Sequence, residues 1–261
     1  MNKKNFALIT GASSGIGFEC SKNLAKRGYN LILIARSKKK LMEMKQNLEK
    51  IYEIECVVIV SDLTQKGSVQ KIINYIEKER LRVEVGILNA GFGDYKDFEH
   101  SLISNQLEMI QLNISSLTEL THGLIPIMKR QKSSYMLHIA STAAFQPIPQ
   151  MSVYAATKSF VLSFSQAIRE ELRNDISITT LCPGPTKTHF AQHAHMNEVS
   201  IFKDESKLMS AKEVATQGLD AMFKKKAVIV PGIQNRAGTI LGKLTPISLS
   251  SKLVNKIMNS K

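Results

Sequence analysis

The sequence predicts an α/β fold, a doubly wound and mostly parallel sheet of seven strands with helices on both faces. Seven short runs rich in Val, Ile and Leu alternate with segments long enough for helices, and several runs are continuously apolar, which is typical of strands covered on both faces. The runs cover 6–10, 30–35, 55–60, 83–89, 135–140, 176–181 and 227–231. Helices are expected at 15–27, 38–50, 64–80, 104–130 and 152–173. Strands that alternate with helices imply parallel pairing through crossovers.

The length of 261 residues, 43% of them hydrophobic, suits one large domain over residues 1–261, although length alone also permits two small ones. We find no internal repeat and no low-complexity tract. The alternation breaks at 189–212, which is long for an ordinary connection, so we expect a substrate loop there. Residues 231–261 form a basic C-terminal tail.

The three cysteines, Cys20, Cys56 and Cys182, are far apart and odd in number. This usage predicts a reducing, cytoplasmic location, without a disulfide framework or a thiolate metal site. No window approaches the roughly 18 apolar residues that a bilayer-spanning helix needs. We interpret the start, "MNKKNFALIT", as a first strand rather than a cleaved signal.

The formal net charge is +13, and residues 221–261 contain eight Lys/Arg and no Asp or Glu. Such a segment is either a solvated surface or an attraction site for an anion. The anion can be a phosphorylated cofactor, an acidic carrier protein, a lipid surface or nucleic acid. After Pro246, apolar residues mark one helical face at Leu249, Leu253, Val254 and Ile257. That face predicts packing on the domain or a second subunit, or peripheral contact with an anionic membrane.

The stretch "LITGASSGIG" places three glycines directly after the first predicted strand and at the start of the first helix. A phosphate binds well at a helix N-terminus, and glycine lets the backbone approach it closely. The spacing GxxxGxG therefore favours nucleotide binding over a plain turn. The residues that we assign to it are Gly11, Ser13, Ser14, Gly15, Ile16 and Gly17.

The end of the second strand distinguishes the two nicotinamide cofactors. An NAD site usually has an acidic residue there for the ribose 2′-hydroxyl, whereas "LILIARSKKK" has Arg36 followed by three lysines. A guanidinium matches a phosphate through paired hydrogen bonds. We therefore predict NADP(H), with NADPH preferred over NADH; the alternative is that Arg36 and the lysines begin a solvated helix.

Seven short motifs follow in a fixed order: "TGASSGIG", "SDLT" (61–64), "LNAG" (88–91), "LNIS" (112–115), "IAST" (139–142), "YAATK" (154–158) and "CPGPTKT" (182–188). In this order they resemble the short-chain dehydrogenase/reductase family over about residues 5–190. The resemblance implies a Rossmann-like fold and an oxidoreductase, but it is weak for the substrate. It also implies a homodimer or homotetramer formed through the helices near 104–130 and 152–173.

Carbonyl reduction needs a proton donor, and tyrosine, with a pKa of about 10, needs a neighbour to become useful. Tyr154 and Lys158 are four residues apart on one predicted helix, so Lys158 can lower the pKa of Tyr154. Ser141, at the end of the fifth strand, is expected to hydrogen-bond the carbonyl oxygen. The resemblance adds that Lys158 holds the nicotinamide ribose and that Asn113 holds a water linking Lys158 to solvent.

The resemblance also assigns cofactor contacts to the remaining motifs. It places Asp62 and Leu63 beside the adenine, and the end of the fourth strand beside the ribose. The last segment, after the sixth strand, is assigned to the carboxamide. The full set, with Tyr154 and Lys158, is Asp62, Leu63, Asn89, Ala90, Gly91, Pro183, Gly184, Thr186 and Thr188.

His189, His193 and His195 lie close together in the long loop. Zinc would need further ligands at suitable spacing, and the reaction needs no metal. We expect these side chains to line or cover the substrate cleft, or to face water, and we expect no metal site.

The sequence thus predicts an NADP(H)-dependent oxidoreductase that interconverts a ketone and a secondary alcohol. The substrate can be a 3-oxoacyl thioester, a steroid-like ketone, a small diketone or a sugar; the Met- and Phe-containing loop favours an apolar one, and the basic surface favours a carrier- or CoA-linked one. A non-catalytic NADP(H)-binding regulator or scaffold on the same fold is the alternative. Nucleic-acid binding is disfavoured, because tryptophan is absent and no nucleic-acid motif occurs.

Overall fold

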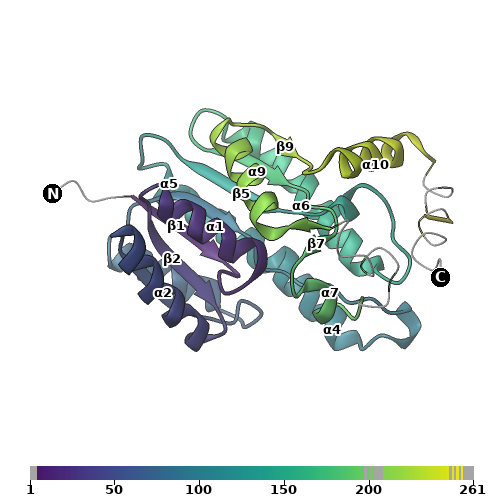
Figure 1. The fold of residues 1–261 in the computed structure, drawn as a ribbon, viewed down its shortest axis with the longest axis horizontal. Helices are drawn as coiled ribbons and strands as arrows, with labels where there is room; N and C mark the ends of the chain where they lie inside the picture. Colours follow the sequence, from purple (N-terminus) through teal and green to yellow (C-terminus); the bar gives the residue numbers. More distant parts are fainter. Residues whose placement is uncertain are drawn as a thin grey trace.

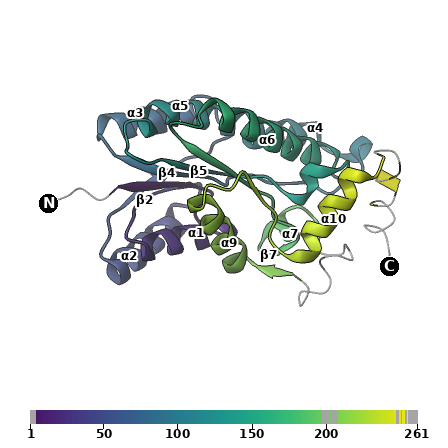
Figure 2. The ribbon, with the colours of Figure 1, turned by 90° about the horizontal axis from the view of Figure 1, so that it is seen from above.

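Seven parallel strands form one sheet in the computed structural model of the chain, in the spatial order β3-β2-β1-β4-β5-β6-β9 (Figures 1 and 2). Along that order the strands are β3 (Cys56–Val60), β2 (Asn30–Ala35), β1 (Phe6–Thr10), β4 (Val83–Leu88), β5 (Tyr135–Ile139), β6 (Ser177–Leu181) and β9 (Val228–Ile229). The structure describes residues 5–196, 199, 202, 208–246, 249, 251, 252 and 254. The predicted doubly wound α/β sheet is confirmed, and its seventh strand is shorter than the predicted run 227–231.

Helices cover both faces of this sheet (Figure 2). One layer contains α1 (Gly15–Lys26), α2 (Lys38–Tyr52) and α9 (Ala211–Phe223). The other contains α3 (Ser68–Lys78), α4 (Ile103–Ile110), α5 (Leu117–Met128) and α6 (Ser152–Glu171). The predicted helix boundaries at 15–27, 38–50 and 152–173 agree with α1, α2 and α6 to within two residues.

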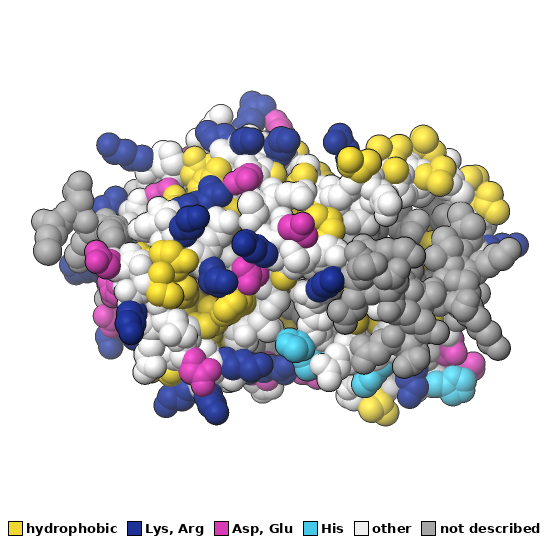
Figure 3. Space-filling view, viewed as in Figure 1, with side chains coloured by type: hydrophobic (Ala, Val, Ile, Leu, Met, Phe, Trp, Pro, Cys, Tyr) yellow, Lys and Arg dark blue, Asp and Glu magenta, His cyan; other side chains and the backbone are white. Residues whose placement is uncertain are grey.

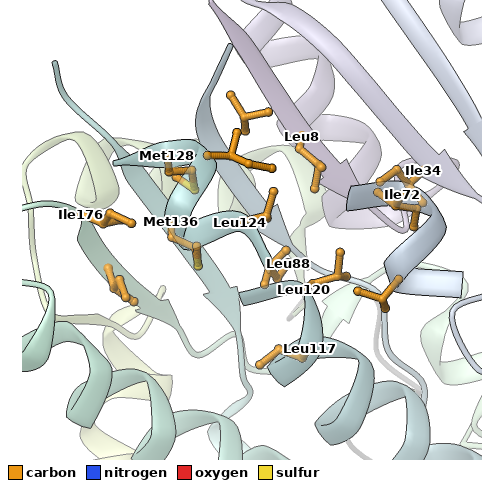
Figure 4. Close-up of a cluster of buried hydrophobic side chains, with 14 of the residues drawn as sticks. Leu8, Ile34, Ile72, Leu88, Leu117, Leu120, Leu124, Met128, Met136 and Ile176 are labelled. Atoms are coloured by element: carbon orange, nitrogen blue, oxygen red, sulfur yellow. The ribbon is translucent and has the colours of Figure 1, made fainter. Parts of the chain in front are cut away.

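Alternate residues of each central strand pack into two separate hydrophobic cores, one on each face of the sheet. Leu8 pairs with Ile32 in the neighbouring strand, and both pack beneath α3 and α5. The next pair, Ile9 and Leu33, faces the opposite core beneath α1 and α2. Figure 4 shows part of the first core, where side chains from the strands meet those of α3 and α5. Burial on both faces explains why these strands read as continuous apolar runs.

The predicted helix at 104–130 is interrupted. Between α4 and α5 the backbone forms a π-helical segment, Gln111–Ser116, which contains Asn113. The Ser116 hydroxyl hydrogen-bonds the carbonyl oxygens of Gln111 (2.9 Å) and Leu63 (2.5 Å). π-turns are uncommon and are often found at functional sites.

Smaller elements follow the sixth strand. β7 (Thr186–Lys187) pairs in parallel with β8 (Met209–Ser210), and α7 (Phe190–His193) lies between them in sequence. The predicted loop 189–212 therefore contains short regular elements, and part of it lies outside the described residues. No helix in the described ranges is both long and apolar enough to cross a bilayer.

A helix that the sequence reading did not predict, α10 (Ile233–Leu244), follows β9. The face predicted after Pro246 falls largely outside the described residues. Of its members that are described, Leu249 is exposed, whereas Val254 is buried in a cluster that also contains Met151 and Tyr154.

Candidate active site

The residues predicted for the site lie where strands of the large sheet end. Gly11, Arg36, Asp62, Asn89, Ser141 and Pro183 follow β1, β2, β3, β4, β5 and β6 by one to two residues. All these strands are parallel, so their carboxyl ends share one edge of the sheet. The chain leaves β1 toward β2 on one side and reaches β4 on the other, which makes this edge a topological switch point. Ligands of open α/β sheets bind in the crevice at such points.

The glycine turn brings backbone close to backbone. Gly11 and Gly15 have positive φ angles of 63° and 55°. A Cβ on Gly17 would lie 2.4 Å from the Gly11 carbonyl oxygen and 2.6 Å from Asn89 Nδ2. Ser14, the N-cap of α1, makes no side-chain capping hydrogen bond. The first N–H groups of α1 are thus presented at a turn without side-chain bulk, which fits a phosphate.

Thr10 ties the ends of β1 and β4 together, and the sequence reading did not single it out. Its hydroxyl oxygen accepts hydrogen bonds from the N–H groups of Asn89 (2.9 Å) and Ala90 (3.0 Å). Asn89 Nδ2 in turn donates to the carbonyl oxygens of Thr10 (3.0 Å) and Gly11 (3.3 Å). The sequence feature that could have identified Thr10 is a hydroxyl residue at the last position of the first strand, directly before the first glycine.

Arg36 and Asp62 approach each other across the ends of β2 and β3. Arg36 is exposed, and Asp62 accepts hydrogen bonds from the Thr64 N–H (3.0 Å) and hydroxyl (2.8 Å). Burial by itself raises the pKa of Asp62, but these two bonds and the charge of Arg36 together bring it below its usual value. The pair therefore places a cation and a hydrogen-bond acceptor near each other at the ends of β2 and β3.

Ser141, Tyr154 and Lys158 meet between β5 and α6. Ser141 caps the 3-10 helix η3 (Thr142–Phe145), where its oxygen accepts from the Ala143 N–H at 3.1 Å. Its side chain also hydrogen-bonds Tyr154. The Lys158 ammonium lies 5.8 Å from the centre of the Tyr154 ring and donates to the Ile139 carbonyl oxygen at 2.9 Å.

Burial dominates the acid–base behaviour of this group. It raises the pKa of Tyr154 to about 12, although the hydrogen bond with Ser141 acts in the lowering direction. It lowers the pKa of Lys158 to about 8, against a smaller raising effect of Cys182. The predicted lowering of the Tyr154 pKa by Lys158 is not found in this structure, because burial outweighs the lowering effect of Ser141 and the net shift is upward.

Asn113 holds the backbone of Phe92 with both ends of its amide. Its Nδ2 donates to the Phe92 carbonyl oxygen (3.0 Å) and to the Thr157 hydroxyl (3.1 Å), and its Oδ1 accepts from the Phe92 N–H (3.2 Å). Both hydrogens of Nδ2 are used in these bonds, so the side-chain nitrogen does not donate to a water here. The water-holding role implied by the family resemblance stays a prediction.

Gly91 lies against this asparagine. A Cβ at Gly91 would lie 2.9 Å from Asn113 Oδ1 and 3.4 Å from Lys158 Nζ. The small residues at the end of β4 thus leave room for Asn113 and Lys158 to reach the same place. The structure brings the predicted catalytic and ribose-side residues together there.

The segment after β6 closes the site from the other side. Pro183 accepts a hydrogen bond from the Thr142 N–H at 2.8 Å, and the Thr186 hydroxyl donates to the Gly184 carbonyl at 2.8 Å. A Cβ on Gly15 would lie 3.2 Å from the Thr188 methyl group. The glycine turn and the start of the predicted substrate loop are therefore neighbours.

An apolar wall covers Tyr154. The Phe190 ring lies 5.4 Å from the Tyr154 ring, and a Cβ on Gly93 would lie 2.8 Å from Phe190 Cζ. Neither Phe190 nor Gly93 was predicted. The buried members of this cluster are Met109, Ala143, Met151, Tyr154, Ala155, Ala191, Ala194, Met196, Val199 and Val254.

The three histidines of the loop are exposed, and the rings of His189 and His193 are 6.5 Å apart. Within the ranges that the structure describes, no group of three or more His, Cys, Asp or Glu is placed to hold a metal ion.

Comparisons with known proteins agree with this geometry. Residues 5–198 match the family described as short chain dehydrogenase. The very-long-chain 3-oxoacyl-CoA reductase-A of Danio rerio is 34% identical over 64% of this chain, and 17-beta-hydroxysteroid dehydrogenase type 3 of Homo sapiens is 31% identical over 77%. The chain spans 53% and 65% of their lengths. A solved short-chain dehydrogenase from Sphingobium yanoikuyae in complex with NADPH is 27% identical, with a TM-score of 0.82 over 91% of this chain and 92% of that one.

Proposed function

This chain belongs to the short-chain dehydrogenase family, and we propose that it is an NADP(H)-dependent oxidoreductase that reduces an apolar ketone to a secondary alcohol. The observation that carries the proposal is the placement of the half-buried Ser141 and the buried Lys158 on either side of the buried Tyr154, at the switch-point edge. Three groups able to bind an oxygen, give it a proton and stabilise the remaining charge lie there together.

The choice of NADPH rests on charge at the end of β2, because the family match leaves the two cofactors open. Arg36 stands where an acidic residue would bind a ribose 2′-hydroxyl. Lys38, Lys39 and Lys40 occupy the first turn of α2, which has no acidic residue. Cations there are disfavoured by the helix macrodipole unless an anion faces them. A 2′-phosphate bound beside Ser13, Ser14 and Arg36 supplies that anion.

The chemistry divides between cofactor and protein. A bound NADPH supplies the hydride to the carbonyl carbon. Tyr154, with a pKa near 12, is protonated at neutral pH and can donate its proton to the carbonyl oxygen. Ser141 donates a hydrogen bond to the same oxygen, and Lys158, mostly charged at neutral pH, stabilises the phenolate left behind. The protonated form of Tyr154 is the one that carbonyl reduction requires.

The walls of the site support an apolar substrate. Phe190, Met151 and the residues packed with them cover Tyr154 with hydrocarbon and thioether groups, which is the usual lining of a small-molecule site. The two curated relatives described above act on long-chain 3-oxoacyl-CoA and on hydroxysteroids by their names. We propose a 3-oxoacyl or steroid-like ketone, free or CoA-linked.

The test is the binding of NADPH and NADH to the purified protein and to Arg36→Asp. We expect NADPH to bind more tightly, and Arg36→Asp to weaken NADPH by at least about tenfold while leaving NADH nearly unchanged, since a charged hydrogen bond contributes roughly 1.5–3 kcal/mol. Lys71→Asp, which makes the same charge change at an exposed position of α3, is the matched control and should leave both affinities unchanged. Equal binding of both cofactors to the wild type would overturn the NADPH assignment.

Tyr154→Phe distinguishes the enzyme from the alternative, a non-catalytic NADP(H)-binding regulator, when ketone reduction is measured beside cofactor binding. The enzyme hypothesis expects unchanged NADPH binding and a loss of ketone reduction of about 10²–10⁴-fold, the usual contribution of a general acid. A regulator would bind NADPH and show no turnover for the phenylalanine variant to lose.

A further inference from the structure

The outer face of α10 is apolar and exposed. Ile233, Ile240, Leu241 and Leu244 have 90%, 53%, 60% and 78% of their surface accessible. At 100° per residue they fall on one side of the helix, together with the exposed Ala237. Figure 3 shows these hydrophobic side chains gathered along the outer edge of α10, at the upper right of the molecule.

The opposite side of α10 packs on the protein. A Cβ on Gly184 would lie 2.4 Å from the Asn235 side chain, and a Cβ on Gly242 would lie 2.7 Å from Gln146 Oε1. Between these two contacts, Thr239 is 7% exposed. The helix therefore turns its small and polar residues inward and its large aliphatic residues outward, the reverse of an ordinary surface helix. An exposed apolar row of this size marks an interaction surface.

The sequence segment that contains this row carries charge of one sign. Residues 221–261 contain eight Lys/Arg and no acidic residue, and Arg236 is exposed on the flank of the row. A two-fold contact between copies would set this face against itself and bring like charges together without an acidic partner from the same segment. A surface that is apolar inside and anionic outside complements both features.

We propose that α10 docks on a lipid surface that carries anionic head groups. Ile233, Ile240, Leu241 and Leu244 insert among the acyl chains, and Arg236 on the flank of the row meets the phosphates. The same helix contacts the loop after β6 at Gly184 and the end of η3 at Gln146, so docking brings the bilayer close to the segments that follow β5 and β6. The lipid contact itself needs neither cofactor nor substrate.

The experiment is co-sedimentation of the full chain with vesicles of phosphatidylcholine alone and with vesicles in which about a third of the lipid is phosphatidylglycerol. We expect binding to the anionic vesicles, weaker binding to the neutral ones, and release in high salt. Ile240→Gln with Leu244→Gln should weaken binding by at least about tenfold, because two aliphatic side chains no longer insert. Ile51→Gln with Leu102→Gln, which removes two aliphatic side chains of 65% and 64% exposure outside the helices expected to pair subunits, is the matched control and should bind as the wild type does.

Circular dichroism and NADPH binding of both double variants establish that they fold. No sedimentation of the wild type with either vesicle, or equal loss in both double variants, would overturn the proposal. An altered gel-filtration volume for Ile240→Gln with Leu244→Gln, together with absent vesicle binding, would instead assign the row to contacts between copies. Because the readout is lipid binding, failure here leaves the proposed reductase activity untouched.

Discussion

At the scale of single residues, burial determines how Tyr154 and Lys158 hold their protons. Both side chains are less than a tenth exposed, so each is pushed toward its neutral form. The spacing of the two residues predicted that they share one helix face, and they do. The direction of the Tyr154 pKa could not be read from that spacing, because it depends on burial, to which Phe190 contributes from another part of the chain.

Lys158→Arg tests this residue-scale picture. With the pKa of Lys158 lowered to about 8, the lysine loses its charge as the pH rises through that value. The kcat/KM of ketone reduction should fall there, because the cation no longer stabilises the Tyr154 phenolate. Arginine stays charged, so the alkaline fall should move to higher pH in the variant, whatever its absolute activity. A pH–rate profile measures this, and an unmoved inflection would assign the fall to another group.

At the scale of elements, most strand ends were predictable, but a π-helical segment and the helix α10 were not. The runs 6–10 and 30–35 coincide with β1 and β2 because every residue of these strands is buried and most of them pack into one of the two cores. The π-segment at Gln111–Ser116 was hidden, since side-chain type does not reveal one extra residue per turn. α10 was missed because Gly238 and Gly242 weaken its helix signal and its apolar face points outward.

Gly17→Ala tests the glycine turn as an element. The added methyl would meet the Gly11 carbonyl oxygen and the Asn89 amide, neither of which can retreat without moving β1 or β4. We expect a loss of roughly 1–3 kcal/mol in the free energy of unfolding, as in other overpacked sites, and loss of NADPH binding. Denaturant unfolding and cofactor titration measure both.

Gly238→Ala is the matched control. A Cβ there meets nothing within 4 Å, and alanine favours a helix, so stability should be unchanged or rise by about 0.4–1 kcal/mol. Wild-type stability and cofactor affinity in Gly17→Ala would contradict the close approach seen in the turn.

At the scale of the whole molecule, a buried histidine couples stability to pH. His138, on β5, is fully buried, with Nδ1 2.7 Å from the Ser165 hydroxyl oxygen and Nε2 3.2 Å from that of Thr121. Burial lowers its pKa to about 3. Nothing in "YMLHIA" distinguished this side chain from an outward-facing one, because its burial depends on α5 and α6 covering that face.

The native state therefore keeps His138 neutral, while the unfolded chain takes up the proton below a pH of about 6.5. The contribution of His138 to the free energy of unfolding is fully present above that pH. It is lost as the pH falls toward 3, by about 1.4 kcal/mol per pH unit. Unfolding in denaturant across this range should show a flatter pH dependence for His138→Gln than for the wild type. His122→Gln, at an exposed histidine, is the control. The same slope in all three proteins would contradict this role for His138.

The order of the strands also links cofactor binding to the time course of folding. The edge that receives the nucleotide is assembled from the ends of β1 to β6, whose residues run from Gly11 to Pro183. On a ribosome the glycine turn emerges early, but β4, which holds it through Asn89, emerges some 80 residues later. A ligand that binds only the assembled edge stabilises the native state as a whole by mass action. Under the proposed function the dinucleotide is such a ligand, and its supply is then expected to act on the cellular lifetime of the protein as well as on its catalytic turnover.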